Sequence, residues 1–242
     1  MTFATGLLKV TSAVIIVVAL AFTASYLLPQ NIIVLEDTEA KTLDMGLDED
    51  ITVDMPKEYI QMPTLRFGLP FRISLMSVDD PVAKQIAEQI TERVSESEGD
   101  DWDKAVMVAK LVHLNVDYEE DNLDHWKLPW ETLRDGKGDC EDYAILTKAI
   151  LDEMGLDSIF IMETNHMTVG VYTGSEAGYG LEVHGKFYQT LETMHSYTPG
   201  DAKLKDMYLT MSSGWNIFDV IELAICFILI AMCSYVLRSD DD

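Results

Sequence analysis

Two long apolar segments, one near each end, place the strongest constraint on how this chain can fold. Residues 10–28 carry no charged side chain, and residues 217–237 form a second apolar run that ends at Arg238. At about 1.5 Å per residue, a helix of either length can cross the roughly 30 Å hydrocarbon core of a bilayer. We therefore predict a transmembrane anchor within residues 1–30, a second span over 216–238 and a lipid bilayer as one partner.

Each apolar segment has an alternative explanation. Ala19, Ala21 and Ala24 supply the small residues of a cleavage site, so the first segment can also be interpreted as a secretory signal. We favour the retained anchor because the apolar run is longer than a signal core. In the second segment, Asp219 and Glu222 interrupt the first two turns, where a helix N-terminus at the membrane edge tolerates acids.

The flanking charges predict the orientation of the two spans. Lys9 precedes the first and Arg238 follows the second, so the positive-inside tendency puts both termini in the cytoplasm. The central part, residues 31–215, is then extracytoplasmic. Partner subunits in the membrane cannot be identified from these residues.

The charge balance excludes a class of partner for the central part. Lys and Arg total 17 against 42 Asp and Glu, a net charge of −25, so the chain should repel nucleic acid. We interpret most of the acids as a solvated surface. The hydrophobic content of 48% is too high for a disordered chain and predicts a compact core.

Between the apolar segments the pattern predicts one domain with flanking connections. Residues 31–76 resemble an acidic, Pro-containing stalk with some extended structure, residues 77–195 the domain, residues 196–215 a linker, and residues 239–242 an acidic tail.

Within the domain, helical periodicity precedes alternating periodicity. Asp80 and Pro81 open a helix of about four turns, and a second helix is expected from Asp101 to about Asn115, with Trp102, Val106, Ala109 and Val112 toward the core. Residues 116–137 are predicted as a loop. A third helix is expected from residue 139 or 140 to 154, followed by strands over 158–162, 166–171 and 186–192.

Cys140 is the cysteine that lies outside the apolar segments, and it is the candidate nucleophile. The first turn of a helix stabilises a thiolate through unpaired N–H groups and the helix dipole. Asp139, Glu141 and Asp142 oppose this, so they must cap the helix or pair elsewhere if the thiolate is to form. An unpaired cysteine can also be a small buried hydrophobe.

A cysteine nucleophile ordinarily needs a histidine that is oriented by a third group. His166 begins a strand whose opposite face is apolar, so its ring is expected to face a cleft. Glu192, on a neighbouring strand, is the candidate orienting carboxylate. Glu182 is the rival, within a glycine-rich segment.

These residues carry a resemblance to a known family. Residues 131–146, ETLRDGKGDCEDYAIL, are similar to the active-site segment of transglutaminase-like cysteine proteins. The segments NHMTVGV from Asn165 and KFYQTLET from Lys186 resemble two later marks of the family: a histidine that opens a strand and an acid near the end of the next one. The similarity covers roughly residues 78–193.

The resemblance implies an α+β, papain-like fold in which N-terminal helices pack on an antiparallel sheet, here flanked by the two spans. It implies Cys140 as nucleophile, His166 as general base and then acid, and Glu192 as the orienting group. The backbone N–H of Cys140 would be one oxyanion donor, and Trp126 and Trp130 are candidates for a second. Many relatives carry Asp rather than Glu as the third member, and an aromatic residue where this chain has Thr168.

The sequence therefore predicts a membrane-anchored thiol enzyme that acts on amide bonds of a protein or peptide through a thioester, with hydrolysis favoured over cross-linking. The alternative is a catalytically silent module that binds peptide in an envelope or membrane complex. A metal site built from Cys140, His166 and acids ranks below both, because no paired ligand spacing is present. No cofactor or metal is predicted.

Overall fold

The structure is a computed structural model of the whole chain. It describes residues 12, 15–17, 37–46, 48–57, 80–120, 126–204, 209–212, 225, 228 and 230. The two predicted spans fall mostly outside these residues, and the acidic tail 239–242 lies outside them entirely. Within the described residues, none of the helices has the length and apolar character needed to cross a membrane.

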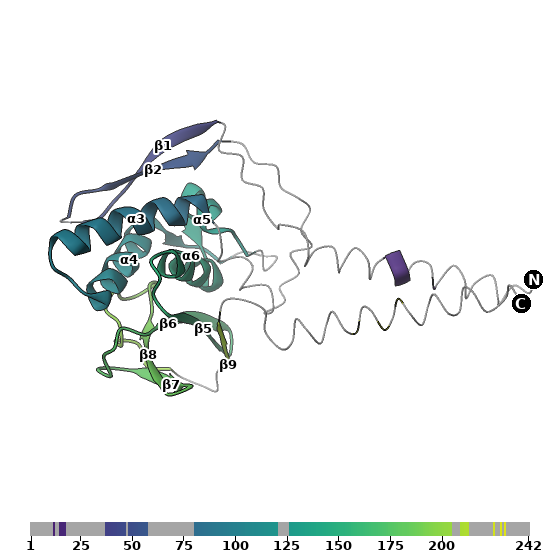
Figure 1. Cartoon of the computed structure of the whole chain (residues 1–242). Coiled ribbons are helices and arrows are strands. Elements are labelled where there is room, and N and C mark those ends of the chain that lie inside the picture. The colour runs from purple at the N-terminus through teal and green to yellow at the C-terminus, as the bar shows by residue number, and fades with distance from the viewer. Residues whose placement is uncertain are drawn as a thin grey trace, which may run out of the picture. The chain divides into compact units, whose positions relative to one another are not determined.

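In its described residues, the domain contains four helices and an antiparallel sheet, with a short hairpin on the other side of the helices (Figure 1). The helices are α3 (Pro81–Glu96), α4 (Asp101–Asn115), α5 (Pro129–Asp135) and α6 (Cys140–Glu153). The sheet strands are β5 (Ser158–Glu163), β6 (His166–Val171), β7 (Gly180–Val183), β8 (Lys186–Leu191) and β9 (Leu209–Ser212). The predicted α+β core of helices on an antiparallel sheet is confirmed.

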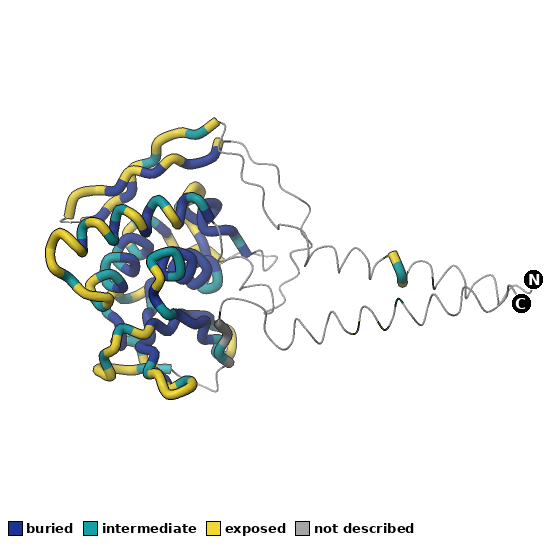
Figure 2. The backbone as a smooth tube through the Cα atoms, viewed as in Figure 1, coloured by how far each residue is buried: buried dark blue, intermediate teal, exposed yellow. Residues whose placement is uncertain are grey.

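Helix α6 is the centre of the domain. Every residue from Asp142 to Leu151 is buried, which is the pattern of a helix surrounded by other elements, and α6 lies in the dark-blue interior of Figure 2. It contacts α3, α4 and α5 as well as strands β5 and β6. The helix ends where Gly155 adopts a left-handed conformation with φ of 74°, as its sequence predicts. Cys140 is thus the first residue of the most enclosed helix.

The sheet has the strand order β7-β8-β6-β5-β9, with antiparallel pairing throughout. One face of β6 and β8 packs into the main core with Met167, Val169, Val171 and Leu191. The opposite face carries a smaller apolar cluster of Ile159, Ile161, Leu181 and Tyr188. His166 starts β6 on this second face, because side chains alternate along a strand.

The described part of the predicted stalk is a hairpin that belongs to the core. Strands β1 (Thr38–Leu43) and β2 (Ile51–Pro56) pair in antiparallel register, and β2 contacts α3. Leu43, Met45 and Ile51 are fully buried in the same cluster as the helices. The extended structure expected there is present, but it packs on the domain instead of standing apart from it.

Three other local predictions differ from the structure. The predicted loop 116–137 contains α5 and two short parallel strands, β3 (Asp117–Tyr118) and β4 (Lys137–Gly138). Strand β9 lies in the segment predicted as a linker. On α4, Trp102 and Val106 are only half-buried, because the helix turns Ala105 and Val108 toward the core.

Candidate active site

The start of α6 is shaped by close packing between Gly138 and Asp142. A Cβ on Gly138 would lie 2.6 Å from Cβ of Asp142, so only glycine fits beside the first turn of the helix. Asp142 in turn accepts the backbone N–H of Asp139, which occupies the N-cap position. The GDCED motif therefore has a structural basis at its first and fifth residues.

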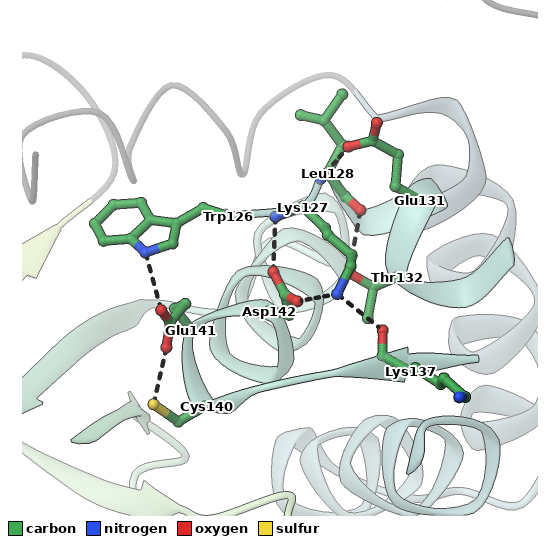
Figure 3. A network of polar contacts seen from close by, with 9 residues as sticks. All are labelled: Trp126, Lys127, Leu128, Glu131, Thr132, Lys137, Cys140, Glu141 and Asp142. Carbon is green, nitrogen blue, oxygen red and sulfur yellow. Dashed lines mark hydrogen bonds and ion pairs between the residues drawn. The ribbon is translucent and has the colours of Figure 1, made fainter. Parts of the chain in front are cut away.

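Asp142 also ties the helix start to the preceding loop (Figure 3). Its carboxylate, which is fully buried, accepts the backbone N–H and the ammonium group of Lys127, each at 2.7 Å. Burial raises the pKa of Asp142, and the bonds from Lys127 oppose that shift. Asp142, one of the three acids around Cys140, is therefore part of a structural ion pair with Lys127.

Glu141 interacts with the thiol itself. Sγ of Cys140 donates to Oε2 of Glu141 at 2.9 Å, while the indole N–H of Trp126 donates to Oε1 at 3.0 Å (Figure 3). The pKa of the Cys140 thiol is raised to about 12, first by burial and then by the hydrogen bond and negative charge of Glu141. The backbone N–H of Met167 donates to the sulfur and lowers the pKa. In this arrangement the thiol is protonated at neutral pH.

The contact with Met167 places the sulfur beside the start of β6, where His166 precedes it. Nε2 of His166 lies 2.5 Å from Oε2 of Glu192. Both side chains are partly buried, with exposed fractions of 27% and 11%. Nε2 is therefore the ring nitrogen that faces the Glu192 carboxylate.

Strand register explains why these two residues meet. In the β6–β8 pairing, Val169 opposes Leu191 and Gly170 opposes Thr190, so continuing the register puts Glu192 opposite Thr168. Thr168 shares a face with His166, and Glu192 is therefore a diagonal neighbour of the ring. The rival Glu182 lies on β7, where it pairs with Phe187 of β8, and it is exposed. Strand β8 separates it from β6 and His166.

The segment after β8 is fastened to the helices. Thr193 is buried, and its hydroxyl lies 3.3 Å from that of Thr147 on α6. Nδ1 of His113 on α4 lies 3.1 Å from the carbonyl oxygen of Thr193. Helix α6 therefore carries Cys140 and also contacts Thr193, the residue next to Glu192. This contact connects the helix that bears the thiol with the segment that bears the carboxylate.

Neither tryptophan occupies a position open to substrate as an independent donor. Trp130 is fully buried in the helical core, with the Arg134 guanidinium 4.9 Å above its ring. Trp126 is nearly buried and directs its indole N–H to Glu141. Both candidates for a second oxyanion donor therefore have other roles here, because one supports packing and the other holds a carboxylate.

The other histidines that the structure describes occupy different parts of the domain. His113 bonds a backbone carbonyl, His184 occupies an exposed turn with φ of 50°, and His195 is exposed after β8. His125 lies outside the described residues. In the ranges that the structure describes, no three His, Cys, Asp or Glu side chains are grouped as metal ligands.

Sequence reasoning missed two members of this neighbourhood. Glu163 pairs with His166 across the β5–β6 hairpin, whose two-residue turn, Thr164 and Asn165, was a readable signal because Asn favours the positive φ of 60° found there. The bond from Trp126 to Glu141 had no such signal, since it joins an irregular loop to a helix.

Part of the chain is similar to a known protein family. Residues 82–188 match the sequence profile of a family described as a transglutaminase-like domain, DUF553. The matched residues are similar to that domain and make up less than half of the chain. The match includes Cys140 and His166 and ends before Glu192. No curated protein matches the chain.

Among solved structures, the chain is similar to LapG of Legionella pneumophila. The calcium-bound form has 18% identity and a TM-score of 0.33 over 59% of this chain and 97% of LapG, and another LapG structure has 18% and 0.34 over 62% and 95%. A protein of Parabacteroides distasonis, provisionally named a protease, has 10% identity and a TM-score of 0.35. That match covers 74% of this chain and 41% of the other protein.

Proposed function

We propose that this protein is a membrane-anchored cysteine peptidase or amidase that cleaves an amide bond of a protein or peptide through a thioester on Cys140. The observation that supports this most is the junction of α6 with β6. There the N–H of Met167 contacts the sulfur, and the adjacent His166 is paired with Glu192 at 2.5 Å.

The roles follow from the chemistry of these groups. Nδ1 of His166 takes the thiol proton, and the sulfur forms a bond to the carbonyl carbon. The backbone N–H of Cys140 stabilises the oxyanion, and the imidazolium returns the proton to the nitrogen of the departing amine. Water then attacks the thioester with His166 as base, which restores the thiol. Glu192 holds the ring and stabilises the imidazolium.

This chemistry requires the thiol to leave Glu141. With Sγ 2.9 Å from Oε2 of Glu141 and its hydrogen donated to that oxygen, the sulfur is a poor nucleophile, and its proton must be redirected to His166 before attack. We propose that rotation of the Cys140 side chain about χ1 redirects this proton, since sp³ torsions exchange between staggered wells. We regard the described arrangement as a resting state of the site.

The hydrogen bond from the Cys140 thiol to Glu141 favours a second candidate function, a catalytically silent binding module that retains the fold. A thiol whose pKa is raised to about 12 and whose proton is held by Glu141 does not need to react. In that case the residues at the start of α6 serve only to pack the domain, and a peptide is bound without being cleaved.

The experiment that separates the two is acylation of the full-length chain in detergent by p-nitrophenyl acetate. An enzyme releases a burst of p-nitrophenol close to one equivalent and retains an acetyl group on Cys140, which peptide mass mapping locates. Cys140→Ser is the control, because Cys226 and Cys233 can also react. A burst that survives Cys140→Ser, or no burst at all, overturns the catalytic proposal and leaves the binding module.

Membrane anchoring is the second part of the proposal, and it rests on the apolar residues 10–28 and 217–237. We propose that both termini are cytoplasmic, that the domain faces outward, and that nucleic acid is not a partner. Alkaline carbonate extraction of membranes should leave the chain in the pellet, and deletion of either segment alone should not release it. Release of the intact chain by carbonate would contradict anchoring.

A further inference from the structure

A cavity of about 330 Å³ lies against the His166–Glu192 pair. Its floor is the second face of the sheet, where Thr168 and Thr190 are buried, and its wall is the segment after β8. Lining side chains from that segment and from the sheet edge are Glu163, Met194, His195, Ser196, Asp201 and Leu204, together with Ala202 and Lys203.

The wall is held in place by backbone contacts with β8. The N–H of Gly200 donates to the carbonyl of Thr190 at 2.7 Å, and the hydroxyl of Thr190 donates to the carbonyl of Ala202. Ser196 donates to Asp201 at 3.1 Å. Specific hydrogen bonds therefore hold the segment that forms the cavity wall against β8.

The position of the cavity relative to the reacting atoms indicates which half of a substrate it meets. His166 and Glu192 line it, whereas Cys140 does not. In amide cleavage by a thiol, the acyl half stays on the sulfur, and the amine half departs beside the imidazole that protonates it. A cavity on the histidine side of the site is therefore on the amine side of the scissile bond.

The lining indicates the chemistry of the group that fits. Met194, Ala202 and Leu204 give an apolar wall that suits an alkyl chain. Glu163 and Asp201 contribute two carboxylates besides Glu192, against the single ammonium of Lys203, and the chain as a whole carries −25. The local potential thus favours a cation over an anion.

We propose that this cavity binds the residue on the amine side of the scissile bond and prefers an alkyl side chain that ends in an ammonium group, as in lysine. The inference rests on the proposed thioester chemistry and names its substrate class. A primary amine bound in the same place can also attack the thioester. Its nitrogen then forms the new C–N bond and loses a proton to His166, the C–S bond breaks, and the sulfur recovers that proton.

The test uses this reverse step, because an attacking amine occupies the site of the leaving amine. The full-length chain is acetylated at Cys140 with p-nitrophenyl acetate, and the loss of the acetyl group is timed with lysinamide, norleucinamide or the α-amide of glutamic acid. Lysinamide and norleucinamide share the α-amine and the alkyl chain and differ in the ammonium group. We expect lysinamide to react about tenfold faster than norleucinamide, as one added charge-assisted contact implies, and the glutamic acid amide to react slowest.

Variants locate the preference. Asp201→Asn and Glu163→Gln should each lower the ratio of the lysinamide rate to the norleucinamide rate, while Glu182→Gln, on the exposed side of β7, should leave it unchanged. A normal burst followed by equal rates for the three amines would overturn the cavity inference and leave the acyl-enzyme standing. Absence of the burst would instead overturn the proposed function on which the inference rests.

Discussion

The two halves of the site differ in how their protons are held. On the sheet side, His166 and Glu192 form a short contact between a base and the carboxylate that orients it. On the helix side, the Cys140 thiol donates to Glu141, which is itself held by Trp126. In the proposed mechanism, the sheet half accepts a proton, and the helix half holds the proton that would be transferred.

The difference also separates the two acids that follow Cys140. Asp142 is fully buried and satisfied by Lys127, so its role is to fasten the loop to the helix. Glu141 is the acid that controls the thiol. The two adjacent carboxylates therefore have different roles: Asp142 stabilises the fold, and Glu141 accepts the hydrogen bond of the thiol. Substitutions can test each role separately.

The largest expected effect is the loss of the base. His166→Ala should reduce the rate of Cys140 acetylation by p-nitrophenyl acetate about 1,000-fold, in the range that general base catalysis supplies. His195→Ala is the matched control, since His195 is exposed and lines the cavity without contacting Glu192 through any described hydrogen bond. Equal losses in both variants would mean that His166 is not the base.

Removing the structural cation should affect stability. Lys127→Met leaves the Asp142 carboxylate buried without its ammonium partner and should cost about 3 kcal/mol of unfolding free energy, measured by urea denaturation. The control is Lys137→Met, because the Lys137–Glu119 pair is exposed on both sides and should contribute much less to the unfolding free energy. Similar costs for the two variants would show that Asp142 is not a structural acid.

Glu192→Gln should preserve shape and remove the charge that stabilises the imidazolium. We expect the acetylation rate to fall about 100-fold with no large change in the urea midpoint. Glu182→Gln should change neither quantity, since Glu182 is exposed on β7. A greater loss for Glu182→Gln than for Glu192→Gln would exchange their roles.

Substitution at the contact between Thr147 of α6 and Thr193 should give a smaller effect on stability and rate. Thr147→Val removes the hydroxyl that lies 3.3 Å from Thr193, at a cost of about 1 kcal/mol in stability. Because Thr193 follows Glu192, the acetylation rate should also fall a few-fold. A rate that is unchanged in a measurably destabilised variant would show that the contact stabilises the domain without positioning the carboxylate.

The smallest expected effect concerns Trp126. Trp126→Phe keeps the ring and removes the N–H that holds Glu141 at 3.0 Å, so Glu141 should bind the thiol less firmly. The rate of Cys140 alkylation by iodoacetamide at pH 7 should rise about threefold. A fall in that rate would mean that the indole promotes reactivity instead of restraining it.

Local rules were sufficient for the elements that carry the site. Capping residues and apolar spacing located α3 at Asp80 and α6 at Cys140, and alternation located the strand that begins at His166. The order of cysteine, histidine and acid along the chain then indicated the pairing of His166 with Glu192. These features depend on neighbours in sequence or on one strand pairing.

The features that could not be predicted depend on contacts between distant segments. The hairpin of β1 and β2 lies in an acidic, proline-containing segment, and its burial depends on α3, which no local pattern encodes. The bond from Trp126 to Glu141 and the cavity wall at Gly200 arise from irregular loops. The sequence indicated that the acids around Cys140 must be neutralised, but only the three-dimensional arrangement distinguished Asp142 from Glu141.

The most direct test of the central claim, that Glu141 and His166 compete for the Cys140 proton, is a double-mutant cycle on alkylation of Cys140 by iodoacetamide at pH 7. Replacing the carboxylate by its neutral amide in Glu141→Gln should lower the raised thiol pKa, because a negative charge and a charged acceptor are removed. With His166 present the rate should rise at least about tenfold. In the His166→Ala background the gain should be smaller, since the electrostatic effect on the thiol pKa remains but no imidazole is present to take the proton. An equal gain in both backgrounds, or no gain in either, would contradict the account.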